Sequence, residues 1–237
     1  MKLAVIDSRM PTEACENLKK LGYEICPLPP HPHLDAPVSA HPDMLLFLSP
    51  DAVYCTSEYA KTAKKPLQTI AWHTKRKLVL TERKQRAEYP QDILFNAAAV
   101  GQYLFCLCAH TAWELLHTKQ YTIVPVKQGY AKCSTLPIGD NALITEDPSI
   151  AKAASELGFD VLKISPNAVR LPGYSTGFLG GAASYSPYNA AKEILFCGDL
   201  DLHPDAAAIR AFCAKHNQIP VTLGAFPLTD VGTIFLL

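Results

Sequence analysis

The stretch from residue 141 to residue 162, NALITEDPSIAKAASELGFDVL, holds the clearest local pattern in the chain. Its first residues are apolar and predict a strand. Asp147 followed by Pro148 is typical of a helix start, because the carboxylate can cap free N–H groups and proline fits the first helical position. Gly158 marks the helix end, and the apolar residues 159–162 predict a second strand. The stretch therefore predicts one strand–helix–strand unit.

The same unit recurs along the chain. We predict five copies, at residues 3–25, 52–72, 103–126, 141–162 and 193–223. In the second copy we expect a helix over 57–64 and the closing strand over 68–72. A period of roughly 40 to 50 residues indicates a repeat architecture, in which each unit buries its apolar faces against its neighbours.

A further strand, rich in small residues, precedes each unit. We predict these leading strands at residues 41–48, 93–100, 129–138 and 178–185. The segment 227–237 has the same character but no helix after it, so it can complete the first unit by pairing with 3–6. The expected fold is α/β: a five-unit, pseudo-symmetric propeller that forms a single domain over residues 1–237. Its ring is closed by the last strand, and the leading strands crowd the central axis.

Composition narrows the functional classes. The chain has 237 residues, 49% of them hydrophobic, and Lys plus Arg equals Asp plus Glu at 22 each. It can bury a large core but has no overall field to attract nucleic acid or an anionic membrane. No apolar run approaches the roughly 18 residues of a membrane span, and we expect a cytoplasmic protein without a membrane partner. The eight cysteines are expected to be free thiols.

Cys133 is the candidate nucleophile. It follows Lys132 and precedes Ser134 on a predicted leading strand. A neighbouring cation and nearby hydrogen-bond donors would stabilise the thiolate, which is the form that attacks carbon. The sequence therefore predicts a site at Cys133, with Lys132 and Ser134 as binding residues. The alternative is a small buried cysteine without chemistry, as free cysteines commonly are.

His41 and Asp43 are the candidate partners of this cysteine. They are separated by Pro42 on another predicted leading strand. In an extended segment, alternate residues share a face, so both side chains would point toward the same space. The alternative is a turn in which the aspartate bonds to its own backbone.

These motifs resemble the pentein superfamily of guanidine-modifying enzymes, and locally the arginine deiminases. The similarity lies in His41-Pro42-Asp43, in residues 92–96 and in 132–137, Lys-Cys-Ser-Thr-Leu-Pro. It implies that Cys133 is the nucleophile, that His41 transfers protons, and that Asp43 orients the substrate or the imidazole. The implied substrate is a guanidine-like or amidine-like small molecule, with neither metal nor cofactor.

The chain departs from the deiminase pattern in two respects. Its units would be circularly permuted. Where those enzymes hold the guanidinium with carboxylates, this chain has Gly180 and Gly181, and Asp230 supplies the only acid. We expect Asp230, Asn96 and the glycine strand to bind substrate. A single carboxylate binds a buried guanidinium more weakly than a pair of carboxylates does, so free arginine is not the expected substrate.

The rival function is a non-catalytic pentein that binds the ribosome, RNA or a protein. Residues 61–86 carry nine Lys or Arg against a single acid, Glu82, which suits an acidic partner. A binding module has no need of both the His41–Asp43 pair and Cys133, and this argues for the enzyme.

Overall fold

The computed structural model describes residues 2–186 and 192–237. The helices are α1 (Thr12–Lys20), α2 (Pro42–Leu45), α3 (Ser57–Thr62), α4 (Lys64–Thr74), α5 (Trp113–Leu116), α6 (Pro148–Glu156) and α7 (Ala206–Lys215), with short 3-10 helices η1 (Ala36–Val38) and η2 (Leu200–Leu202). The strands are β1 (Lys2–Asp7), β2 (Tyr23–Leu28), β3 (Phe47–Leu48), β4 (Ala52–Thr56), β5 (Lys77–Thr81), β6 (Ala98–Val100), β7 (Tyr103–Cys106), β8 (Thr122–Pro125), β9 (Thr135–Gly139), β10 (Ala142–Thr145), β11 (Asp160–Lys163), β12 (Ser184–Tyr185), β13 (Glu193–Phe196), β14 (Ile219–Thr222) and β15 (Ile234–Leu236).

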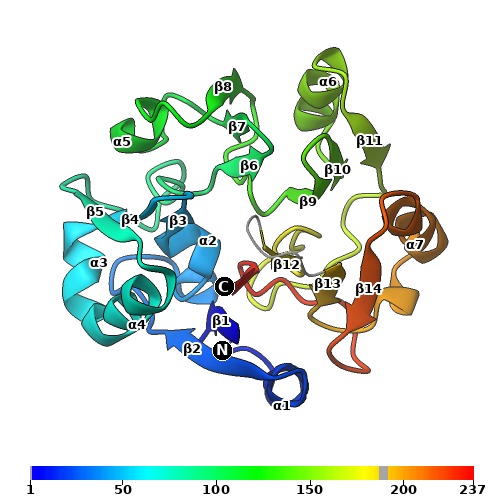
Figure 1. The fold of residues 1–237 in the computed structure, drawn as a ribbon, viewed down its shortest axis with the longest axis horizontal. Helices are drawn as coiled ribbons and strands as arrows, with labels where there is room; N and C mark the ends of the chain where they lie inside the picture. The colour runs from blue at the N-terminus through cyan, green and yellow to red at the C-terminus, as the bar shows by residue number, and fades with distance from the viewer. Residues whose placement is uncertain (1, 187–191) are drawn as a thin grey trace.

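Within these described residues the strands form five small sheets, ordered β12-β15-β1-β2, β3-β4-β5, β6-β7-β8, β9-β10-β11 and β13-β14. Each sheet contains a parallel pair whose two strands are connected through a helix, and in the first sheet β12 and β15 form a second parallel pair. In four sheets a leading strand runs antiparallel to the first strand of that pair. Figure 1 shows the sheets arranged around the middle of the molecule, with the larger helices outside. The protein is thus a mixed α/β fold of several small sheets.

The two ends of the chain lie side by side. Strand β15 pairs antiparallel with β1, with Ala4 opposite Leu236, and it also pairs with β12 on its other side. The backbone N–H groups of Leu3 and Leu237 each donate to the other's carbonyl at 2.8 Å. The predicted pairing of the C-terminal strand with residues 3–6 is confirmed.

The fourth unit forms as its sequence predicts. The Asp147 carboxylate accepts from the N–H groups of Ser149 at 2.8 Å and Ile150 at 2.9 Å, and Pro148 is the first residue of α6. Gly158 adopts a φ of +82°, a conformation that residues with a Cβ rarely adopt, directly after the helix. Local capping chemistry therefore fixes both ends of this helix.

The second unit differs from its prediction. Residues 68–72 lie inside α4, and the closing strand is β5, further along the chain. Pro66 falls in the first turn of α4, where a missing N–H costs nothing. Leu67 and Ile70, three residues apart, are buried on one face of the helix. The helical spacing of these two buried residues therefore decides for a helix, although the β-branched residues of the segment favour a strand.

The leading strands are shorter than predicted. Of residues 41–48, only Phe47–Leu48 form a strand, and residues 42–45 form α2. Of residues 129–138, the strand begins at Thr135, after a turn. Each leading strand therefore starts with an irregular segment near the middle of the molecule.

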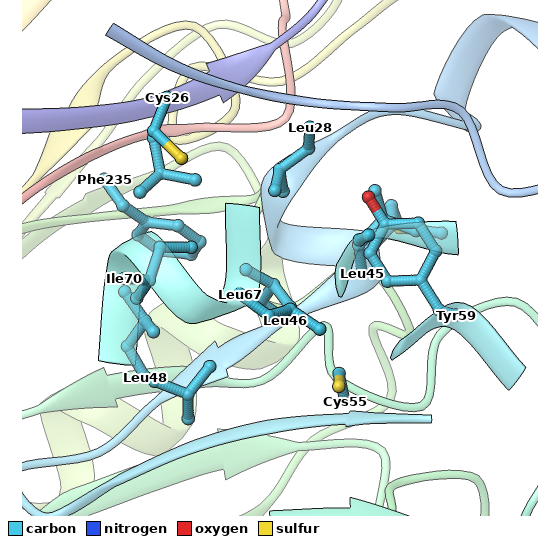
Figure 2. Packing of buried hydrophobic residues seen from close by; sticks show 14 of the residues in the cluster. Cys26, Leu28, Leu45, Leu46, Leu48, Cys55, Tyr59, Leu67, Ile70 and Phe235 are labelled. Atoms are coloured by element: carbon cyan, nitrogen blue, oxygen red, sulfur yellow. The ribbon is translucent and has the colours of Figure 1, made fainter. Parts of the chain in front are cut away.

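A buried apolar cluster holds α2 in place. Leu45 and Leu46 pack with Tyr59 of α3, with Ile70 of α4 and with Phe235 of β15. Figure 2 shows these side chains meeting between the helices and the sheet. Fully burying such a side chain stabilises the fold by about 1.5–3 kcal/mol. This packing fixes the short helix that carries the first polar residues of the centre.

Across residues 2–186 and 192–237, no helix has the length and apolar character that crossing a membrane requires.

Candidate functional site

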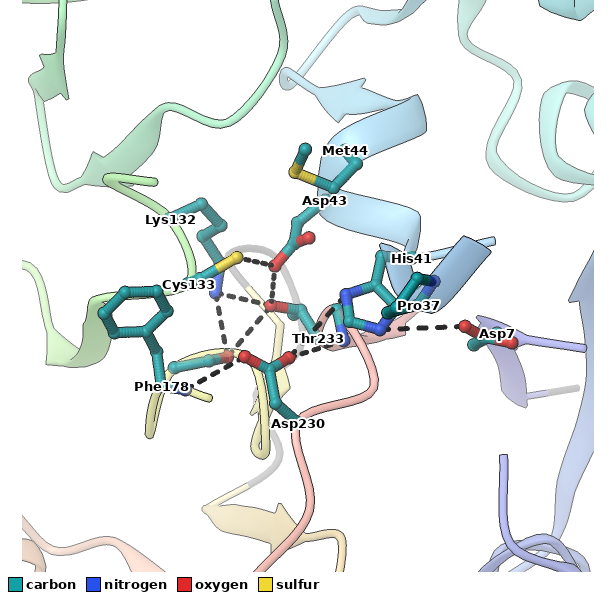
Figure 3. A network of polar contacts seen from close by, with 12 residues as sticks. Asp7, Pro37, His41, Asp43, Met44, Lys132, Cys133, Phe178, Asp230 and Thr233 are labelled. Atoms are coloured by element: carbon teal, nitrogen blue, oxygen red, sulfur yellow. Dashed lines mark hydrogen bonds and ion pairs between the residues drawn. The ribbon is translucent and has the colours of Figure 1, made fainter. Parts of the chain in front are cut away.

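Polar residues gather in the irregular segments that precede the leading strands. They are His41 and Asp43 before β3, Asn96 before β6, Lys132, Cys133 and Ser134 before β9, Gly180 and Gly181 before β12, and Asp230 and Thr233 before β15. Because these segments occupy the same position in each unit, the repeat brings them together in the middle of the molecule. Figure 3 shows most of them in one network.

Cys133 lies in a tight turn that Asn96 holds. The Asn96 Oδ1 accepts from the backbone N–H groups of Lys132 at 2.8 Å and Cys133 at 3.2 Å. The Asn96 Nδ2 donates to the Cys133 Sγ at 3.1 Å. One amide side chain therefore fixes both the turn and the sulfur atom.

Asp43 is the carboxylate beside the thiol. The Cys133 Sγ donates to the Asp43 Oδ2 at 3.2 Å, and the hydroxyl of Thr233 lies 2.9 Å from the same oxygen. Asp43 is fully buried, and its Oδ1 has no hydrogen-bond partner within residues 2–186 and 192–237. The thiol thus donates to a carboxylate whose second oxygen can still accept a hydrogen bond.

His41 points away from this pair. Its Nε2 lies 3.8 Å from the Asp7 Oδ2 and its Nδ1 lies 3.8 Å from the Asp230 Oδ1. The expectation that His41 and Asp43 share one face of an extended segment is wrong. Pro42 opens helix α2, and a helical turn sends residues two apart in different directions. The imidazole therefore sits between two carboxylates (Figure 3).

Lys132 is buried, with 3% of its surface exposed. Its Nζ donates to the hydroxyl of Thr233 at 3.0 Å and to the carbonyl of Gly180 at 3.4 Å, and it lies 5.1 Å from the centre of the Tyr185 ring. An ammonium in this position faces an aromatic π-face and two oxygens. The cation is thus part of the interior network.

The surroundings of Cys133 favour the protonated thiol over the thiolate. Burial above all, then the negative charges of Asp43 and Asp230, raise the pKa of Cys133 well above its usual value, against the Asn96 hydrogen bond. Burial also lowers the pKa of Lys132. Desolvation disfavours the charged form of both groups, so attack by Cys133 needs a base that takes its proton.

The glycine strand makes room for the network. A Cβ on Gly181 would overlap the Asp230 carboxylate, and one on Gly180 would overlap the carbonyls of Lys132 and Cys133. The Gly181 N–H donates to the Cys133 carbonyl at 3.0 Å. Both glycines are therefore needed for close backbone approach, and Gly180 contributes a carbonyl.

Asp230 and Ser134 complete the predicted set. The Asp230 carboxylate accepts from the N–H groups of Phe178 and Gly232 at 2.9 Å each, and burial raises its pKa. The Ser134 Oγ is buried and has no partner in the described part of the chain. Asp230 thus faces His41 rather than Cys133.

Sequence reasoning missed three polar residues of this region. Asp7 ends strand β1, Thr233 precedes β15, and Glu146 follows β10. The repeat offered a signal for Thr233, which precedes its leading strand much as Cys133 does. Burial raises the pKa of Glu146 to about 8, with help from the charges of Asp230 and Asp147.

Glu146→Gln is expected to stabilise the protein at alkaline pH. The pKa of Glu146 rises from 4.5 to about 8 on folding, so the folded form holds a proton that the unfolded chain releases between these values. Stability therefore falls as pH rises through this window, and glutamine, isosteric with the protonated acid, removes the fall. Melting temperatures between these two pH values test it, with Glu156→Gln, whose side chain is 66% exposed, as the control. Equal pH slopes for wild type and Glu146→Gln would contradict it.

Comparison with protein families identifies the chain. A family model matches residues 5–235, nearly the whole sequence. The chain belongs to DUF6873, a family of unknown function. No curated protein is similar enough in sequence to match this DUF6873 chain.

Solved structures show what fold the DUF6873 chain has. It is similar to SxtG, an amidinotransferase of the saxitoxin biosynthetic pathway from Microseira wollei, with a TM-score of 0.52 and 10% identity over 97% of this chain and 89% of that one. It is also similar to DDAH from Pseudomonas aeruginosa, solved as a cysteine-to-serine mutant with citrulline, with a TM-score of 0.52 and 11% identity over 98% and 92%. Both are penteins, and the DUF6873 chain shares their fold.

Proposed function

We propose that this protein is a cysteine-dependent enzyme that breaks a C–N bond at a guanidine-like or amidine-like carbon of a small molecule, by hydrolysis or transfer. The contact that carries the proposal joins the Cys133 Sγ to the Asp43 Oδ2 at 3.2 Å, in the middle of a pentein fold. A thiol that donates to a buried carboxylate has a base for its proton, and the Asn96 amide steadies the sulfur at 3.1 Å.

The chemistry follows from these contacts. Asp43 takes the thiol proton, the sulfur forms a bond to the carbon, and the C–N bond breaks as the leaving amine gains a proton. Water, or an amine in a transferase, then replaces the sulfur, and Cys133 regains its proton. The resemblance to the penteins assigns to His41 the protonation of the leaving amine and the activation of water. The imidazole lies 3.8 Å from Asp7 and from Asp230, so in this proposal it turns toward Cys133 when substrate binds.

We further infer that the five sheets are the units of a pseudo-symmetric propeller. The repeated order of leading, first and closing strands supports this, as does the pairing of β15 with β1. The circular permutation relative to the arginine deiminases stays a prediction.

Activity is tested by screening release of ammonia or amine from guanidines, amidines, ureas and amides. We expect Cys133→Ala to abolish turnover, and Asp43→Asn to lower it by about 10²–10⁴, the range of general base catalysis. Cys213→Ala is the matched control, because Cys213 is a buried cysteine of helix α7, outside the central network.

The rival reading makes a different prediction. If no compound turns over, and Cys133→Ala and His41→Ala leave the binding of RNA or protein partners intact, the protein is a non-catalytic binding module. The basic segment 61–86 would then be the surface to mutate.

A further inference from the structure

The carboxylates of the central network already have internal partners. Asp7 forms an ion pair with Arg9 at 2.7 Å, and His41 lies between Asp7 and Asp230. Asp43 is linked through the hydroxyl of Thr233 to the ammonium of Lys132. Among the described residues, each of these three carboxylates thus has a basic side chain of the network beside it or one hydroxyl away.

Lys132 already places a buried cation in this network, one hydroxyl away from Asp43. Its ammonium is bonded to Thr233 and Gly180 and lies over the Tyr185 ring, beside the carboxylate that contacts the thiol. A second buried cation at this point would have to displace that ammonium or share its counterion. Either step is strongly disfavoured, because it leaves a buried charge without a partner.

Thr233 fixes this arrangement at the expense of backbone strain. It is fully buried and has a φ of +70°, a genuine outlier for a β-branched residue. Its hydroxyl contacts the Lys132 Nζ, the Asp43 Oδ2 and the Gly180 carbonyl, at 3.0, 2.9 and 2.9 Å. Such strain persists only where the surroundings over-determine it, and here it holds the hydroxyl between cation and anion.

The open hydrogen-bonding capacity of the site suits an uncharged group. The Asp43 Oδ1 is a buried acceptor without a partner in the described chain, and the hydroxyls of Ser134 and Thr135 are buried and also unpaired there. Asp43, Lys132 and Tyr185 line a cavity of about 10 Å³, roughly the space of one water molecule. The cavity therefore offers one open N–H acceptor, the Asp43 Oδ1, and a ligand must widen it to enter.

We propose that the group bound beside Cys133 is electrically neutral, such as a primary amide or urea whose N–H donates to the Asp43 Oδ1, and not a guanidinium or amidinium. This rests on the proposed function and narrows its substrate class. Lys132 supplies the positive charge that a cationic substrate would otherwise bring.

Two alkylating probes of matched size test the proposal: 2-chloroacetamide, which is neutral, and 2-chloroacetamidine, which is cationic. In each case the C–Cl bond breaks, an S–C bond forms, chloride leaves, and the thiol proton passes to Asp43 and then to solvent. Peptide mass spectrometry measures the rate at Cys133, and the partly buried thiol of Cys15 is the internal reference. Normalised to Cys15, we expect the amide to react with Cys133 about tenfold faster or more, the ratio that about 1.4 kcal/mol gives.

Variants of the network sharpen the result. Lys132→Met should shift the preference toward the amidine, because Asp43 then lacks its cation. Because Lys132→Met is expected to be unstable, a second variant is needed. Thr233→Val has a similar shape but no hydroxyl, and it should also shift the ratio of amide to amidine reaction toward the amidine. Thr233→Ser keeps the hydroxyl and should keep the wild-type ratio of the two rates. Circular dichroism confirms that each variant is folded.

The outcomes separate the two proposals. A faster amidine reaction at Cys133 in the wild type, or an unchanged ratio in Thr233→Val, overturns the neutral-substrate inference and leaves the nucleophile standing. Failure of both probes at Cys133, while Cys15 reacts, counts against the proposed function and removes the basis of the inference with it.

Discussion

Deletion of residues 233–237 is expected to leave the protein unfolded or aggregated. Strand β15 lies between β12 and β1, and Ile234, Phe235 and Leu236 are at most 3% exposed. Three such side chains contribute roughly 5–9 kcal/mol, which is comparable with the roughly 5–15 kcal/mol that stabilises a whole domain. The deletion also exposes the edges of β12 and β1 to other chains. Thermal unfolding and size-exclusion chromatography measure the result.

A circular permutant is the matched control for this deletion. Joining residue 237 to residue 2 through a short Gly/Ser linker, and opening the chain at the exposed turn between Asp140 and Asn141, keeps β15 beside β1. We expect this protein to fold and to unfold cooperatively. A truncated protein that melts at the wild-type temperature would show that β15 does not hold the sheet together.

Lys132→Met should destabilise the protein by about 3–5 kcal/mol, the usual cost of removing one partner from a buried ion pair. Asp43 would keep its charge and lose the cation that it reaches through Thr233. The double variant Lys132→Met with Asp43→Asn should recover much of the loss, because no charge is then left unpaired. Chemical denaturation of the two single variants and the double variant forms the thermodynamic cycle.

The control for this cycle is Lys77→Met. Lys77 pairs with Asp51 at 3.1 Å, but its side chain is 65% exposed, so we expect a change of about 0–1 kcal/mol. If Lys132→Met lowers the free energy of unfolding only as much as Lys77→Met does, or if the double variant recovers none of the loss, then Lys132 and Asp43 are not coupled as their contacts indicate.

Lys132 also predicts the direction of an alkaline effect. Burial lowers its pKa in the folded state, so between that lowered value and the usual one the unfolded chain binds the proton more strongly. Stability therefore rises with pH through this window. Lys132→Met should lack this rise, which pH-dependent denaturation curves would show relative to the wild type.

Much of the fold could be predicted from the sequence, because local sequence patterns mark the start and end of the repeated elements. Asp147, Pro148 and Gly158 define one unit through capping chemistry alone, and its copies give the order of strands and helices. The chain-closing strand at residues 227–237 was readable because it lacked a helix. The strand predicted at 68–72 was wrong because burial of Leu67 and Ile70, a tertiary effect, decided for a helix.

The candidate site was predicted as a set of residues but not as a geometry. Cys133, Asp43 and Asn96 do meet, yet the period-two argument for His41 and Asp43 failed, because Pro42 starts a helix there. The direction of the pKa shift of Cys133 could not be predicted from its neighbours in sequence, because it depends on how completely distant segments bury the thiol. Thr233 carries no motif, and its role comes from a backbone conformation that composition does not reveal.

The pairing of β1 with β15 has a consequence for synthesis of the protein. Strand β1 has a neighbour that is encoded much later in the chain, with Val5 opposite Phe235. Until residues 234–236 emerge, one edge of β1 stays open, and the network that needs Asp230 and Thr233 stays incomplete. The nascent chain is thus expected to complete its native centre only after residues 234–236 have been translated, so holding chaperones would act on an intermediate in which β1 is still unpaired on that edge.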